Sequence, residues 1–355
     1  MAVKGGGPIH KGDLQQHFDG LYAVIGTTTE FVEATVAQLH VFRTSLEAAD
    51  RSVQEIAEAL EESQKNAASL WEMADETQLL ALNATITAYR VQQAGHVVDV
   101  IASAVLDLSR EIEEAAQQMG GLLQKMRSTT TRMRKELAEV GGLISEDLLP
   151  RMRRLRTGLD EFEALRKEWR HLATVQEHKP GDEPEEGRER VNEIVEEMQR
   201  RVAQTLHFLD RVDHALAQTA EQLSVFPRAG AELQDQGAQI QRAAEKSRIA
   251  AQDLRLLALR IAIEAAQDET KRFSSLAETF HQRADEAYTM MRQLQAAVET
   301  LTRRNGQVSR EMKYLLQGLS RTQQQTQETA RTLPPFQEAI EALLQTYAAE
   351  SVATG

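Results

Sequence analysis

Apolar residues recur at alternating intervals of three and four along most of this chain of 355 residues. A repeat averaging 3.5 residues places one narrow apolar seam along a helix and predicts left-handed coiled-coil packing. The first seam extends from Leu21 to Ala88 without losing its phase. Its larger members include Ile25, Val32, Leu39, Phe42, Leu46, Val53, Ile56, Leu60 and Leu70. A chain with this pattern is expected to be all-α.

Three further seams follow, over residues 98–144, 195–265 and 273–319. Glu177–Gly187 reads EHKPGDEPEEG, whose prolines, glycines and acids predict a solvated linker between the second and third arms. The predicted fold is a long antiparallel four-helix coiled-coil bundle made of two fused helical hairpins. The expected segments are a tail at 1–12, a first hairpin at 13–176 with its tip at about 90–96, a linker at 177–188, a second hairpin at 189–333 with its tip at about 267–272, and a short C-terminal helix and tail at 334–355.

Prolines are expected to disturb three of the arms. Pro150 follows the Gly141–Gly142 pair and removes a backbone donor, so it should kink or break the second arm. Pro227 lies inside the third arm, where the seam keeps its phase, which predicts a kink and not an end. Pro334 and Pro335 are expected to end the fourth arm.

Composition narrows the possible functions. The net charge is −13 at pH 7, whereas nucleic-acid binding requires a basic surface. The basic stretch from Arg127 to Arg156 is better explained by solvent exposure or pairing with acids. The chain has no cysteine, and His207 and His214 lack further ligands at metal-binding spacing, so no metal and no cofactor are expected. No phosphate-binding loop or nucleophile motif is found, so no enzymatic activity is predicted.

Targeting signals are also missing from the sequence. The chain starts with MAVKGGGPIHKGD, which has no apolar signal segment, and it contains no apolar run of about 18 residues. These features predict no membrane span and a cytoplasmic location.

One segment of the first arm recurs about half a chain length later. Residues 76–109 read ETQLLALNATITAYRVQQAGHVVDVIASAVLDLS, and residues 256–266 read LLALRIAIEAA, with Ala81 aligned to Ala258. A repeat this long indicates a duplicated hairpin and not a solenoid. Alanine replaces larger seam residues near both segments, which predicts closely packed helices there.

The first of these segments resembles the hairpin tip of bacterial chemoreceptors, the methyl-accepting chemotaxis proteins. The matching residues are Leu79, Leu80, Ala81, Leu82, Asn83, Ala84, Ile86, Ala88, Arg90, Gly95, Val100, Ala102, Val105 and Leu108. In that family a dimer of two hairpins forms the bundle, so this chain looks like both hairpins fused. The resemblance implies a non-enzymatic signal transducer or scaffold whose tip contacts a chemotaxis histidine kinase and its coupling adaptor, and other receptors. The predicted partner-binding residues are Leu79, Leu82, Asn83, Arg90, Ile263 and Glu264.

The segment also departs from the family pattern. Thr87 and Gln93 stand where the family has glutamate, and His96 stands where it has arginine. The alternative is therefore a structural coiled-coil rod that kept the fold but lost kinase coupling. A helix lying on a lipid surface fits less well, because its apolar face would be wide and bordered by bases.

The resemblance further implies methylation at adjacent Glu or Gln pairs on exposed helix faces. The candidates are Glu61, Glu62, Gln323 and Gln324, although neither pair has the full flanking pattern of the family. Helices this rich in Glu and Gln produce such pairs by accident, and a solvated face is the favoured explanation.

Overall fold

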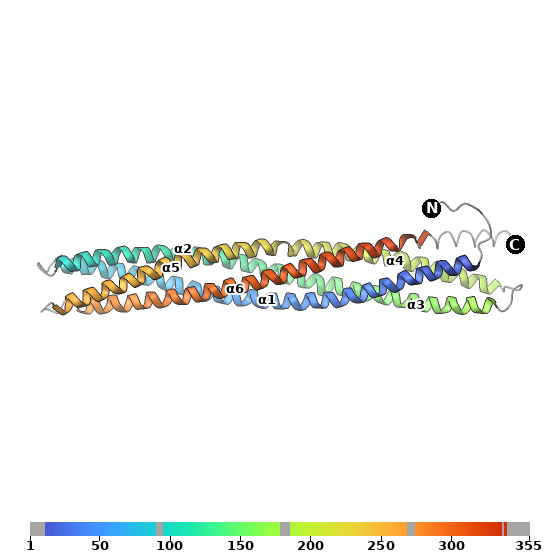
Figure 1. Cartoon of the computed structure of the whole chain (residues 1–355), viewed down its shortest axis with the longest axis horizontal. Helices are drawn as coiled ribbons and strands as arrows, with labels where there is room; N and C mark the ends of the chain where they lie inside the picture. The colour runs from blue at the N-terminus through green and yellow to red at the C-terminus, as the bar shows by residue number, and fades with distance from the viewer. Residues whose placement is uncertain (1–10, 90–94, 178–184, 268–273, 336, 339–355) are drawn as a thin grey trace. The chain divides into compact units, whose positions relative to one another are not determined.

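The computed structural model describes residues 11–89, 95–177, 185–267, 274–335 and 337–338 (Figure 1). These residues are almost entirely helical, which confirms the all-α prediction. The elements are α1 (Lys11–Tyr89), α2 (Gly95–Gly142), the π-helical segment η1 (Leu143–Leu148), α3 (Leu149–Glu177), α4 (Glu185–Leu223), α5 (Val225–Gln267) and α6 (Ser274–Thr332).

Most of the residues predicted to form the two tips and the linker lie outside the described residues. α2 begins at Gly95 and α4 begins at Glu185, inside the segments expected to form the first tip and the linker. α1 likewise begins at Lys11, inside the expected N-terminal tail. The expected C-terminal helix after Pro335 lies almost entirely outside the described residues.

Contacts divide the chain into two compact units. Unit 1 comprises Met1–Leu46, Ala138–Ser224 and Tyr314–Gly355, and unit 2 comprises Glu47–Leu137 and Val225–Lys313. Each unit contains parts of both predicted hairpins, so the hairpins pack against one another and do not form separate domains.

In unit 2, polar contacts join α1, α2, α5 and α6 in a ring. The N–O pairs are Arg134–Asp50 at 3.9 Å, Arg132–Glu232 at 3.2 Å, Gln295–Glu245 at 3.0 Å and Arg304–Glu55 at 2.7 Å. Gln78 of α1 donates to Glu113 of α2 at 2.6 Å, so residue numbers fall on α2 as they rise on α1. Neighbouring helices are therefore antiparallel. α1 and α5 are not neighbours in the ring and occupy opposite corners.

Unit 1 is a second four-helix ring, in the order α1, α3, α4 and α6. Its contacts are Arg156–Glu33 at 3.0 Å, Arg190–Glu168 at 2.5 Å, Gln327–Asp213 at 3.1 Å, and Phe42 against Gly318. The last contact joins α6 to α1. It is so close that a Cβ atom on Gly318 would overlap the Phe42 ring.

The predicted seams form the cores of these bundles. Every seam position predicted on α1 from Ile25 to Ala88 is buried, and so are those from Val195 to Ile261 on α4 and α5. On α2 one position was predicted wrongly, because Leu108 is only half-buried and Ser109 is buried in its place.

The helical arms continue past Pro150 and Pro227, and next to each proline the α-helical hydrogen-bond pattern is locally interrupted. The Leu149 N–H donates to the Ile144 carbonyl, five residues back, which is the π-helical pattern. This wider turn keeps the chain helical next to Pro150, which has no backbone donor. At the other site α4 ends at Leu223, Ser224 forms a turn, and α5 begins two residues before Pro227.

A polar side chain interrupts the apolar seam of unit 2. Asn305 of α6 is buried, and its Nδ2 donates to the Gly230 carbonyl oxygen of α5 at 2.7 Å. A Cβ on Gly230 would lie 2.6 Å from the Ser309 Oγ atom, so glycine permits this close approach. A single polar seam residue fixes helix register at some cost in stability. We infer that Asn305 aligns α5 with α6.

Candidate functional site

Large apolar side chains form an exposed row on α1 and a matching row on α5, both in unit 2. The α1 row consists of Leu79, Leu82 and Ile86, which are 56%, 52% and 46% exposed. The α5 row consists of Leu256, Leu259 and Ile263, which are 57%, 54% and 52% exposed. The two rows, called the tip rows below, occupy equivalent positions of the duplicated segment. Their spacing of three and four residues keeps each row on one helix face.

On α1, side-chain size is inverted, because Ala81, Ala84 and Ala88 are buried while larger residues face solvent. On α5, Leu254 and Ile261 are buried beside Ala258, so the core side there keeps large residues. Burying leucine instead of alanine would remove more apolar surface from water and stabilise the bundle further. Single exposed leucines are common, but a contiguous apolar row is typical of a surface that contacts another molecule.

The two tip rows lie at the same level of unit 2. Arg283 of α6 forms an ion pair with Glu76 of α1, and Asp285, two residues further on, pairs with Arg255 of α5 at 2.9 Å. Glu76 lies three residues before Leu79, and Arg255 lies one residue before Leu256. Because α1 and α5 occupy opposite corners, the bundle presents one apolar row on each of two corners.

The predicted tip residues fall on or beside these rows. Leu79, Leu82 and Ile263 are row members, and Asn83 is exposed next to Leu82. Arg90 lies outside the described residues, and Glu264 lies in α5 with its side chain outside the description. The residues predicted from the sequence did not include Leu256 and Leu259. Both occur at the positions of Leu79 and Leu82 in the duplicated segment, and this repeat could have identified them.

A small hollow adjoins the α5 row. It has a volume of about 280 Å³ and lies between α5 and α6, with Leu259 and Ala262 on one side and Glu278 and His281 on the other. An apolar wall facing a carboxylate and an imidazole can accept a side chain with an apolar stem and a polar end. The α5 corner therefore offers a carboxylate and an imidazole next to its apolar row.

The other predicted positions are mostly solvent-facing. Glu61 and Glu62 are exposed on α1, and Glu61 pairs with Lys65 at 3.2 Å. On α6, Gln323 is half-buried, while the exposed Gln324 donates to Glu328 at 2.9 Å. Both pairs can be reached from solvent, and they lie in different units.

The basic stretch is largely engaged with acids. Arg132, Arg134, Arg151 and Arg156 each form an ion pair with a carboxylate. Arg127 instead donates to the neutral amide oxygen of Gln64. His207 and His214 are exposed on α4, and the described residues contain no cluster of three or more metal-ligating side chains.

The Glu245 carboxylate of α5 has the largest acid pKa shift among the described residues. It accepts hydrogen bonds from Arg248 at 2.7 and 2.9 Å and from Gln295 of α6 at 3.0 Å. The bond from Arg248, and then the bond from Gln295, lower the pKa of Glu245 from 4.5 to about 2. The same contact with Glu245 raises the pKa of the Arg248 guanidinium.

An NMR titration of the Glu245 carboxyl carbon is expected to give a midpoint near 2. Replacing Arg248 with glutamine should return the midpoint toward 4.5, and Gln295→Ala should cause a smaller rise. Because the folded pKa lies below the unfolded one, the contact stabilises the fold above about pH 4.5 and is lost as the pH falls toward 2. The carboxylate is half exposed, so the effect on global stability is small. An unshifted midpoint in the native protein would contradict the geometry.

Within the described part of the chain, no helix combines the length and apolarity needed to cross a membrane.

Comparison with known proteins identifies three similar chemotaxis transducers. The chain is 36% identical over 75 residues to the transducer protein Htr18 of Halobacterium salinarum, a match covering 21% of this chain and 9% of that protein. It is 32% identical over 112 residues to the methyl-accepting chemotaxis protein TlpQ of Pseudomonas aeruginosa, covering 32% and 15% of the two chains. It is 32% identical over 107 residues to the methyl-accepting chemotaxis protein McpB of Bacillus subtilis, covering 29% and 16%.

The matched stretches thus span less than a fifth of each relative. No protein-family profile and no solved structure matches the chain. The described residues form antiparallel four-helix packing in each unit, and unit 2 carries exposed apolar rows on α1 and α5. The chain contains a helical domain like that of methyl-accepting chemotaxis proteins, as its resemblance to their tip predicts.

Proposed function

We propose that this chain is a non-enzymatic chemoreceptor-like signal transducer or scaffold. Its tip rows would bind a chemotaxis histidine kinase and the coupling adaptor of that kinase. The observation that carries this proposal is the pair of equivalent exposed apolar rows, in which Leu79 and Leu82, with their counterparts Leu256 and Leu259, face solvent. Apolar anchors beside polar groups such as Asn83 are typical of the centre of a protein–protein interface.

The direct test is reconstitution with the kinase and adaptor from the same organism. Co-sedimentation and kinase activity should both respond to the chain. The double replacement of Arg90 and Glu264 by alanine is expected to weaken adaptor binding and to leave helical content and melting temperature nearly unchanged. If the double variant unfolds, these two residues are structural. If it binds and signals like the native protein, they do not belong to the contact surface.

The alternative function is that of a structural rod that kept the fold without kinase coupling. The replacements at Thr87 and Gln93 favour it, since both remove a carboxylate that the family carries. A chain that neither binds the adaptor nor changes kinase activity in the reconstitution would support this alternative.

Reversible methylation of Glu61, Glu62, Gln323 or Gln324 is a secondary part of the proposal. All four lie on helix faces with at least partial solvent access. Mass spectrometry after incubation with a chemotaxis methyltransferase would detect a methyl ester on Glu61 or Glu62. Gln323 and Gln324 would have to be deamidated first.

A further inference from the structure

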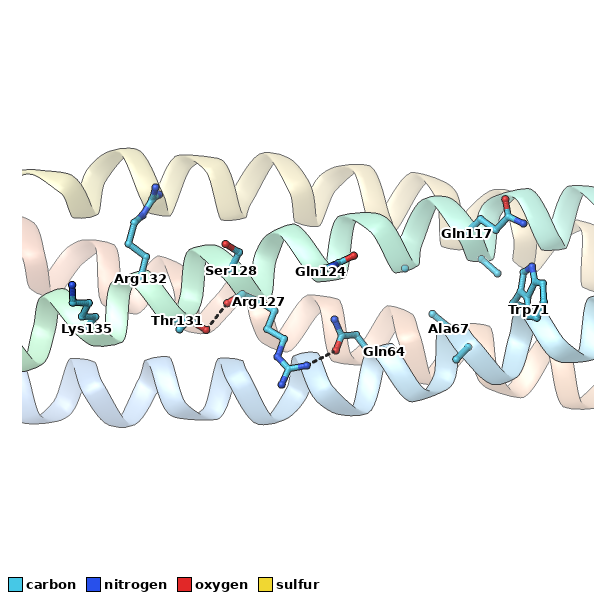
Figure 2. A pocket seen from close by; sticks show the side chains of 13 residues that line it. Gln64, Ala67, Trp71, Gln117, Gln124, Arg127, Ser128, Thr131, Arg132 and Lys135 are labelled. Carbon is cyan, nitrogen blue, oxygen red and sulfur yellow. Dashed lines mark hydrogen bonds between the residues drawn. The ribbon is translucent and has the colours of Figure 1, made fainter.

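An open groove with a volume of about 1050 Å³ lies between α1 and α2 of unit 2 (Figure 2). It is lined by residues 64–71 of α1 and 116–135 of α2, so it does not include the tip rows. At about 1.5 Å per residue, the α2 wall is roughly 28 Å long. The groove is therefore elongated along the helices and is longer than a compact small-molecule ligand requires.

Small residues and an aromatic side chain line one end of the groove. Ala68 of α1 and Ala116 of α2 both line it, and a Cβ on Gly120 would meet nothing within 4 Å. These positions leave room for apolar side chains to approach the helix backbones. Trp71 lies at this end and is 41% exposed (Figure 2). An exposed tryptophan beside small residues is typical of an interface anchor.

Cationic side chains line the other end. Arg127, Arg132 and Lys135 of α2 are exposed here, with Arg127 extending toward Gln64 of α1 and Arg132 extending toward α5 (Figure 2). Arg132 pairs with Glu232 at 3.2 Å, whereas Arg127 donates to the neutral amide oxygen of Gln64 at 3.5 Å. This end therefore presents three cationic side chains, at least one of them paired with a carboxylate, on a chain whose net charge is −13.

We propose that this groove binds an amphipathic helix of a partner protein, with acidic residues at one end of that helix. The apolar face would pack over Ala68, Ala116 and Gly120 against Trp71, and the acidic end would contact Arg127 and Lys135. A helix of about five turns matches the length of the groove, and helix-in-groove binding uses apolar anchors at this spacing. Opposite charges at the basic end fix the direction of the ligand. The proposal does not depend on kinase coupling at the tip rows.

The test uses a synthetic 20-residue peptide with blocked ends, glutamates in its first two turns, and leucine and alanine at helical spacing in the remainder. Glutamates near a helix N-terminus also stabilise the free peptide helix. The chain has two tryptophans, so Trp169→Phe leaves Trp71 as the only tryptophan reporter. Titration is expected to change the Trp71 fluorescence saturably at micromolar peptide, and added salt should weaken the binding.

Matched variants distinguish peptide binding in the groove from nonspecific electrostatic attraction between the peptide and the protein. Gly120→Leu fills the groove and should weaken peptide binding at least 10-fold, and Arg127→Gln should also weaken it. Gly121→Leu is the control, because Gly121 is exposed, is open around its Cβ position and does not line the groove. If Gly120→Leu fails to fold, Ala68→Leu blocks the same groove from α1.

Three outcomes would overturn the proposal. Equal affinities for the Gly120→Leu and Gly121→Leu variants would show that the groove is not the site. A peptide with glutamine in place of glutamate that binds equally well would exclude the assigned role of the basic end. A single-stranded oligonucleotide that displaces the peptide from native protein and binds Gly120→Leu with undiminished affinity would indicate nonspecific attraction to charge.

Discussion

Replacing Leu79 and Leu82 with serine is expected to remove adaptor binding at one corner of unit 2 and to leave the other corner active. The matching Leu256→Ser and Leu259→Ser pair should have the reciprocal effect, and the fourfold variant should not bind. Interface anchors typically contribute about 1–4 kcal/mol each, so losing two corresponds to a decrease of 10-fold or more in affinity. Calorimetry should show half the binding stoichiometry for each pair, and the native stoichiometry for a matched control.

The control for this experiment is Val41→Ser combined with Tyr314→Ser. Val41 and Tyr314 are 46% and 53% exposed but lie outside the tip rows. These replacements remove comparable exposed apolar surface, so they should change neither stoichiometry nor affinity. Because row leucines are more than half exposed, the serine variants should also melt close to the native temperature. A fourfold variant that still binds the adaptor would rule out the tip rows as the docking surface.

The second large effect is expected in unit 1, where Gly318→Ala should destabilise the protein. The new methyl group would overlap the fully buried Phe42 ring. Overpacking of this kind costs about 1–3 kcal/mol, whereas the gain from replacing a helical glycine with alanine is about 1 kcal/mol. A lowered urea midpoint with an unchanged denaturant slope would report this loss.

Gly158→Ala is the matched control for this prediction. Gly158 is also a helical glycine of unit 1, but a Cβ there would meet nothing within 4 Å. This variant should gain up to about 1 kcal/mol in stability. Replacing Phe42 with leucine in the Gly318→Ala background should recover part of the loss, because the smaller side chain makes room for the methyl group. Equal stabilities of the two glycine variants would contradict the observed packing.

The seams were predictable because coiled-coil burial follows directly from spacing. The exception on α2 has a physical cause. That helix buries adjacent residues such as Ala115 and Ala116, and also Leu122 and Leu123. Where two neighbouring positions are both buried, the apolar pattern no longer defines one phase, so the spacing predicts Leu108 while the structure buries Ser109.

The candidate site was predictable only in part. Resemblance to a chemoreceptor tip identified Leu79, Leu82 and Asn83, which are all exposed. It did not show that α1 and α5 occupy opposite corners, because a heptad seam does not specify which helices become neighbours. The groove beside Gly120 could not be predicted for the same reason. It requires α1 and α2 to be adjacent, with small residues at the same level along both helices. The Gly120–Gly121 pair and the exposed Trp71 were its only sequence signals.

Both corners of unit 2 belong to a single polypeptide, and this has a consequence for how the protein can evolve. In a symmetric homodimer every substitution is expressed twice, so its two docking corners must remain identical. Here a substitution at Leu256 leaves Leu79 untouched, and each corner can be selected separately. The hollow beside Leu259, the retained Glu264 on α5 and the threonine at position 87 on α1 are differences of this kind. The two corners of one bundle can therefore diverge independently of one another.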